Sequence, residues 1–138
     1  MADSGYNWDA TWTEVVAATA QQEGEASIVY TSAALDLDGK AGCLISIDTD
    51  YSDHAKATGG LSVYILQECG TGDYEAEADG PWGFEMPFTQ NGTNRKVFFL
   101  SAAQYDTFKI HLDWDNSTTD AVATTDIDIK YCTIPPAS

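Results

Sequence analysis

The chain has 138 residues, of which 43% are hydrophobic and 20% charged, a composition typical of one folded domain and unlike a disordered or repeat protein. Its 22 acidic residues outnumber 6 basic ones, and the formal net charge of −16 disfavours binding to nucleic acid or to an anionic membrane surface. Such a surface suits a basic protein partner, bound cations, or a salty medium that screens the carboxylates.

The chain begins with a short polar segment that contains two aromatic residues, Tyr6 and Trp8. No basic region followed by an apolar run is present here, so we predict no secretory signal. No later stretch is apolar enough for a membrane-spanning helix, and we expect synthesis in the cytoplasm. The expected divisions are an N-terminal arm, a single β-sandwich domain and a C-terminal tail, at residues 1–11, 12–134 and 135–138.

Short apolar runs separated by turn residues recur along the chain and predict β-strands. In chain order the expected strands are 12–18, 27–33, 42–50, 61–68, 73–79, 81–89, 95–101, 105–115 and 121–133. The alanine-rich segment 15–20 also fits one or two helical turns. Both faces of segment 61–68 are apolar, which predicts a central strand or a strand that meets another subunit. Acidic residues alternate through segment 73–79, which predicts a charged edge strand.

The clearest strand runs from Thr107 to Asp115, where polar and apolar residues alternate without a break. Its apolar side carries Phe108, Ile110, Leu112 and Trp114, and its polar side carries Thr107, Lys109, His111, Asp113 and Asp115. Eight or nine strands of this kind, without a long amphipathic helix, predict an all-β, two-layer antiparallel β-sandwich. Jelly-roll or Greek-key connectivity is the expected type.

Groups suited to catalysis are few. The two histidines, His54 in a loop and His111 on the polar side of its strand, are both expected to face solvent. A hydrolytic triad needs a nucleophile, a base and an orienting acid, and the nucleophile-elbow sequence Gly-x-Ser-x-Gly does not occur. We therefore predict that the chain is not an enzyme.

Metal binding has two possible sources in this sequence. The three cysteines, Cys43, Cys69 and Cys132, are too widely spaced for a zinc site, and their odd number excludes a complete disulfide framework within one chain. Short-spaced acidic and amide residues leave calcium as an alternative, and they are Asp36, Asp38, Asp48, Asp50, Asp53, Asp113, Asp115 and Asn116. None matches an EF-hand loop, so we predict no cofactor and keep calcium as the alternative.

Exposed apolar residues give the candidate interface positions. Docking against a neighbouring chain explains Tyr6, Trp8 and Trp12 in their acidic surroundings better than exposure to water does. Tyr64 and Leu66, apolar residues expected on the outer face of their strand, are predicted to form an interface in a small closed homo-oligomer.

Two tryptophans further along the chain have different expected roles. Trp114 lies on the apolar side of the clearest strand, so we expect it in the core. Trp82, between a proline and a glycine, is a candidate for stacking on a sugar ring. It provides the alternative function, a lectin-like carbohydrate-binding module that calcium assists.

Several segments resemble the small accessory virion proteins of tailed bacteriophages, especially capsid decoration and head-associated proteins. They are Leu35 to Gly42, Gly59 to Ile65, and Pro81 to Phe84 leading to Phe98 to Ser101. The resemblance implies an all-β, non-enzymatic, oligomeric protein that binds the major capsid protein or another virion protein on the outside of a shell. It transfers no catalytic residues. A third hypothesis, a cytoplasmic protein of a salt-loving organism, predicts unfolding in dilute buffer.

Overall fold

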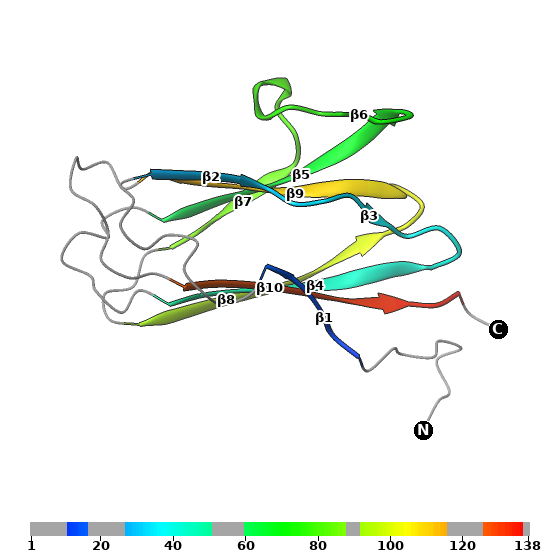
Figure 1. The fold of residues 1–138 in the computed structure, drawn as a ribbon. Coiled ribbons are helices and arrows are strands. Elements are labelled where there is room, and N and C mark those ends of the chain that lie inside the picture. Colours follow the sequence, from blue (N-terminus) through cyan, green and yellow to red (C-terminus); the bar gives the residue numbers. More distant parts are fainter. Residues whose placement is uncertain (1–10, 17–26, 51–59, 88–91, 116–125, 137–138) are drawn as a thin grey trace.

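The computed structural model describes residues 11–16, 27–50, 60–87, 92–115 and 126–136, which form two antiparallel β-sheets stacked face to face (Figure 1). Sheet A has the strand order β1-β10-β4-β8, and sheet B has the order β2-β9-β5-β6, with β3 paired to β9 and β7 paired to β5. The strands are β1 (Thr13–Val16), β2 (Ser27–Thr31), β3 (Leu35–Asp36), β4 (Gly42–Asp50), β5 (Leu61–Gly70), β6 (Asp73–Tyr74), β7 (Gly83–Met86), β8 (Thr93–Ser101), β9 (Thr107–Asp115) and β10 (Asp126–Ile134). The predicted all-β, two-layer sandwich is confirmed.

The connectivity of these strands is that of a jelly roll. Apart from β3 and β6, which have two residues each, eight strands remain in the described chain. Numbered in chain order among these eight, sheet A reads first, eighth, third and sixth, and sheet B reads second, seventh, fourth and fifth. This order results when two Greek keys wind into one sandwich. The short strand β3 extends the edge formed by β2, because both pair with β9.

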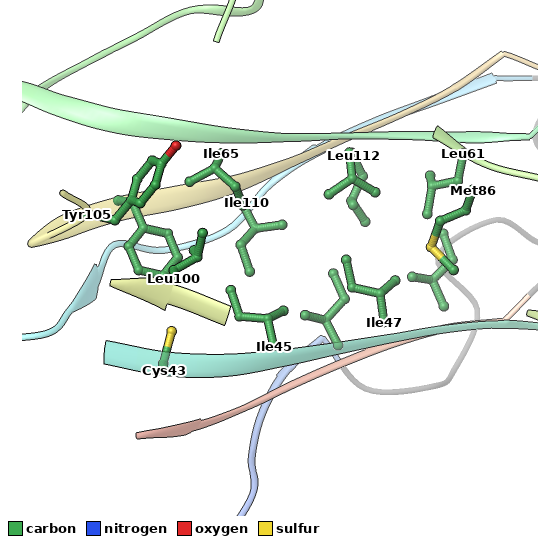
Figure 2. Packing of buried hydrophobic residues seen from close by; sticks show 14 of the residues in the cluster. Cys43, Ile45, Ile47, Leu61, Ile65, Met86, Leu100, Tyr105, Ile110 and Leu112 are labelled. Carbon is green, nitrogen blue, oxygen red and sulfur yellow. The ribbon is translucent and has the colours of Figure 1, made fainter. Parts of the chain in front are cut away.

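The core lies between the two sheets and is built from alternate residues of the central strands (Figure 2). In β4 and β9 the buried side chains are Cys43, Ile45, Ile47, Phe108, Ile110 and Leu112. Each of these strands therefore uses one face for the core and leaves the other for polar residues or covering segments. The predicted bounds of β4 are confirmed, and so is the apolar side of β9 as far as Leu112. The side chain of Trp114 lies outside the described part.

The β5–β7 connection, residues 71–82, differs from the prediction. The sequence predicts an edge strand over 73–79, but β6 ends at Tyr74 and a short 3-10 helix, η1 (Glu77–Asp79), follows. The Asp79 carboxylate accepts a hydrogen bond from the backbone N–H of Ala76 at 2.8 Å, and Gly80 has a φ of 73°. These local features end the extended conformation despite the alternating pattern. In Figure 1 the connection arches over sheet B.

Sheet A has a close contact between β4 and β8 at Gly42. A β-carbon on Gly42 would lie 2.7 Å from two ring atoms of Phe99 and would also meet the backbone oxygen of Leu100. The absence of a side chain at Gly42 thus lets the Phe99 ring lie on the outer face of sheet A. No helix within the described ranges has both the length and the apolar character needed to cross a bilayer.

Candidate binding surface

Large apolar side chains that stay exposed gather on sheet A and beside it. Among the described residues they are Trp12 (41% exposed), Trp82 (48%), Val97 (48%) and Phe99 (53%). Trp12 comes just before β1, and Val97 and Phe99 point from β8 to the outside of the sandwich, since the alternate residues Phe98 and Leu100 pack inward. We call Trp12, Val97 and Phe99 the apolar face. In so acidic a chain, exposed apolar side chains concentrated on one sheet indicate a binding surface.

Trp82 lies at the open side of the sandwich between the edge strands β7 and β8. Its ring centroid is 5.6 Å from that of Phe84 and 5.8 Å from that of Phe98. The rings of Phe84 and Phe98 meet edge to face at 5.1 Å, and Lys96 Nζ is 5.9 Å from the Phe84 centroid. Aromatic packing therefore accounts for the position of Trp82, and its stacking on a sugar stays a prediction.

Trp12 borders a shallow hollow on the outer face of sheet A. This Trp12 hollow has a volume of about 330 Å³ and is lined by Trp12, Ser46, Asp48, Arg95, Val97 and Lys130. A neighbouring hollow of about 430 Å³ adjoins it, because Asp48 and Arg95 line both. The wall of the Trp12 hollow combines an indole ring, an isopropyl group and charged side chains, a mixture that suits small polar ligands with an apolar side.

Opposite charges pair along this face. Arg95 donates hydrogen bonds to both carboxylate oxygens of Asp48, with Nη2 at 2.9 Å from Oδ2, and this bonding raises the pKa of Arg95. Lys130 Nζ lies 3.4 Å from Asp128 and 3.8 Å from Glu14. A hydrogen bond with Asp128, together with burial, raises the pKa of Glu14 against the opposing effect of Lys130. Pairs as exposed as these contribute little to stability, but they hold donors and acceptors in fixed positions.

A second polar cluster, which the sequence did not predict, lies on the outer face of sheet B. His111 Nδ1 is 2.7 Å from Thr31 Oγ1, and its Nε2 is 3.3 Å from Glu77 Oε2. Because a carboxylate only accepts hydrogen bonds, the ring donates to Glu77 through a protonated Nε2, and its Nδ1 bonds to the Thr31 hydroxyl. The prediction that His111 faces solvent is wrong. The residue is only 8% exposed, and Glu77 of the β5–β7 connection contacts its ring.

Thr31, His111 and Glu77 include the three kinds of group found in a hydrolytic triad. The hydroxyl bonds Nδ1 and the carboxylate bonds Nε2, which reverses the usual arrangement of such triads. Neither of the two hollows on sheet A is lined by any of these three residues. We therefore interpret it as the His111 clamp, which fastens η1 to β9 and β2.

The two predicted interface residues on β5 are placed differently from each other. Tyr64 is half-buried, with its ring centroid 6.1 Å from that of His111. Leu66 is 6% exposed, so the prediction that it lies open on the outer face is wrong. The β5–β7 connection folds back along this end of β5, where the backbone N–H of Glu75 donates to the carbonyl of Gln67 at 2.9 Å. An interface through Tyr64 stays a prediction.

Two of the aspartates considered for calcium have partners within the chain. Asp36 Oδ1 accepts a hydrogen bond from the backbone N–H of Asp38 at 2.8 Å, and Asp48 pairs with Arg95. Within the ranges that the structure covers, no three His, Cys, Asp or Glu side chains are grouped so as to hold a metal ion. Of the other predicted positions, the side chains of Tyr6, Trp8, Asp53, His54, Asp115 and Asn116 lie outside the described part.

Val97 and Phe99 are the surface residues that sequence analysis missed. The sequence predicts a strand over 95–101 but assigns no function to it. A signal was present in the unbroken apolar run from Val97 to Leu100, which fills both faces of the strand. Which residues of this run pack into the core and which stay exposed follows only from the fold.

No protein-family model matches the chain, and no curated protein matches it. Solved structures with a similar fold include the coat protein of Tobacco streak virus, 14% identical with a TM-score of 0.40 over 93% of this chain and 88% of that one. The adhesin domain of Lys-gingipain from Porphyromonas gingivalis is 14% identical with a TM-score of 0.47, over 92% and 73%. The CBM22-1 xylan-binding domain from Paenibacillus barcinonensis Xyn10C is 13% identical with a TM-score of 0.39, over 99% and 88%. Similarities of this size carry no argument about function.

Proposed function

We propose that this chain is a non-enzymatic structural protein of a virion, a capsid decoration or other head-associated component, which docks on the outside of an assembled shell. The observation that carries the proposal is the apolar face, whose residues stay 41% to 53% exposed in a chain of net charge −16. Exposed apolar surface of this kind is typical of docking sites, and the net negative charge of the chain disfavours nucleic acid. Jelly rolls occur in viral capsid domains and in lectins, which supports the proposal only as an analogy of fold.

The first experiment is to search for the polypeptide in purified particles of the virus whose genome encodes it. Mass spectrometry should detect it as a regular component of the particle. Its absence from such particles, or the absence of any viral genome around its gene, would remove the proposal.

Docking is then measured by adding the purified protein to particles that lack it. Phe99→Ser should weaken binding about 10- to 100-fold, since burial of a phenylalanine side chain contributes about 1.5–3 kcal/mol. Lys109→Ser, on the opposite sheet, is the matched control and should bind as the unchanged chain does. Equal binding by both variants would exclude the apolar face as the docking surface.

Carbohydrate binding is the second candidate function, and the Trp12 hollow favours it. An exposed indole gives a flat apolar surface on which a sugar ring can stack, and Asp48 and Arg95 present fixed acceptors and donors to hydroxyl groups. The two hollows, of about 330 and 430 Å³, fall in the size range of small-molecule sites. This proposal places the sugar at Trp12, whereas the sequence alone pointed to Trp82.

Calorimetric titration with neutral oligosaccharides separates the two candidates. Carbohydrate binding predicts measurable heat that Trp12→Ala abolishes and Trp82→Ala leaves unchanged. Affinity for sugar with no affinity for particles would favour the lectin-like function, and the reverse would favour the virion component. A parallel titration with calcium that gives no heat at millimolar ion would dismiss calcium assistance.

The proposed lack of enzymatic activity is tested at the His111 clamp. Its hydroxyl, imidazole and carboxylate would act together in ester hydrolysis if they had a catalytic function. We expect no turnover of an activated ester above the rate given by free histidine. Turnover that Thr31→Val abolishes would overturn the proposal.

A further inference from the structure

Strand β8 is the last strand of sheet A on one side, as far as the structure describes the chain. Within the described chain it pairs with β4 alone, over its full length from Thr93 to Ser101 (Figure 1). The outer edge of such a strand presents backbone N–H and C=O groups that can pair with another strand. Val97 and Phe99, exposed on its outer face, add apolar surface to this edge. The edge is therefore suited to adding a strand.

The sequence of β8 is complementary to itself in the antiparallel direction. Its middle reads Arg95-Lys96-Val97-Phe98-Phe99, two cations followed by valine and two aromatic residues. If two copies pair with Val97 opposite the partner's Val97, Arg95 lies opposite the partner's Phe99 and Lys96 opposite the partner's Phe98. Each cation then faces an aromatic ring, a pairing that favours association, and each such contact occurs twice.

We propose that β8 pairs antiparallel with β8 of a second copy of this chain, about a two-fold axis at Val97. The interface is isologous, as in most closed dimers. It joins the two A sheets edge to edge into one continuous eight-stranded sheet, since each sheet A has four strands. Because paired residues lie on the same face of a sheet, both apolar faces point to the same side.

The distribution of charge favours a second copy at this edge over the other edges. Two molecules of net charge −16 repel each other over most of their surfaces. Strand β8 contains two cations and no carboxylate, and β2 contains no charged residue. The other edge strands each contain an acid: Glu14 in β1, Asp36 in β3, Asp73 in β6 and Glu85 in β7. Edge pairing at β8 is thus the contact between copies that combines low repulsion with cation–aromatic attraction.

The oligomeric state of the full chain tests the proposal. Light scattering over a range of concentrations should show a species of twice the 14.9 kDa chain mass, and added salt should strengthen it by screening the net charge. Val97→Lys places two like charges at the axis and should raise the dimer dissociation constant at least tenfold. Thr13→Lys, on the opposite edge of sheet A, makes the same charge change and should leave the dimer intact.

Cross-linking tests the register. In a Cys69→Ser background, Val97→Cys should form a disulfide-linked dimer, because directly opposed residues have Cα atoms about 4.5–5.5 Å apart, within disulfide reach. Phe99→Cys should not, because the two copies of that position lie about 14 Å apart along the strands. The other two cysteines, Cys43 and Cys132, are buried and should not compete.

Three results would overturn the proposal. They are a monomer at every concentration, a dimer that Val97→Lys does not weaken, and cross-linking through position 99 in place of 97. A monomer would mean that Arg95 and Lys96 protect the edge from pairing. The inference does not depend on the virion proposal. A dimer that is absent from particles would support the dimer and exclude the virion function, and a monomer that is present in particles would do the reverse.

Discussion

The His111 clamp gives the sharpest test of how the β5–β7 connection is held. His111→Ala removes both hydrogen bonds of the ring, at 2.7 Å to Thr31 and 3.3 Å to Glu77. A hydrogen bond of this kind contributes about 0.5–1.5 kcal/mol net, so the pair contributes about 1–3 kcal/mol. The side chain of Glu77 is 42% exposed, which lets water replace its partner and argues against the upper end of that range. We expect a loss of about 2 kcal/mol in the free energy of unfolding.

Urea denaturation measures this loss. With a slope of about 2 kcal/mol per molar urea, the midpoint should fall by about 1 M. Hydrogen exchange should show where the effect lies, with faster exchange at the backbone amides of Asp79 and Gly80, which donate to carbonyls within the η1 turn. Gln104→Ala, at an exposed position, is the control and should change stability by less than about 0.5 kcal/mol.

A double-mutant cycle decides whether the clamp works through Glu77. If His111 and Glu77 interact as the geometry indicates, His111→Ala and Glu77→Ala together should cost less than the sum of the single changes, with a coupling of about 0.5–1.5 kcal/mol. A coupling near zero, or a His111→Ala midpoint equal to that of the Gln104→Ala control, would refute the assigned role of the clamp.

Three further predictions follow from other parts of the structure. Gly42→Ala should cost about 1–3 kcal/mol in urea denaturation, because its β-carbon would collide with Phe99 and the β8 backbone; an unchanged midpoint would contradict the close contact. The folded state holds the Glu14 proton more tightly than the unfolded state does, so this contribution to stability is present at low pH and is lost as the pH rises through the raised pKa. Glu14→Gln should therefore be at least as stable as the unchanged chain at pH 7 and show a smaller fall in stability between acidic and neutral pH. Burial raises the pKa of the Cys43 thiol to about 12. A thiol reagent at pH 8 should therefore label exposed Cys69 first and Cys43 only after unfolding. Rapid labelling of Cys43 in the folded protein would contradict its burial.

The sequence best predicted the type, bounds and buried side of the strands that pack one face against the opposite sheet and leave the other face polar. In β4 every second residue from Cys43 to Thr49 is buried, so the pattern of polarity gives both the type of element and its bounds. In β9 the apolar side followed the same rule as far as Leu112. For such strands, local alternation and final burial have the same cause, the packing of one face against the opposite sheet.

The polar side of β9 and the outer side of β5 did not follow their pattern. His111 and Leu66 are both buried, and His111 contacts Glu77 of the β5–β7 connection, whose path depends on the Asp79 and Gly80 turn. No window of sequence around either residue contains information about that connection. The cluster of Thr31, Glu77 and His111 could not be predicted for the same reason, since its members come from three separate elements.

The sequence alone determined that this protein is an all-β sandwich with an acidic exterior, because a period of two and the net charge are properties of composition and local order. Only the tertiary structure decided that β8 lies at an edge of sheet A and that Val97 and Phe99 lie on its outer face, where they stay exposed. The position of a strand at the edge or in the centre of a sheet depends on its pairing with strands that are distant in the chain. The sequence of the strand itself does not indicate how many strands will pair with it.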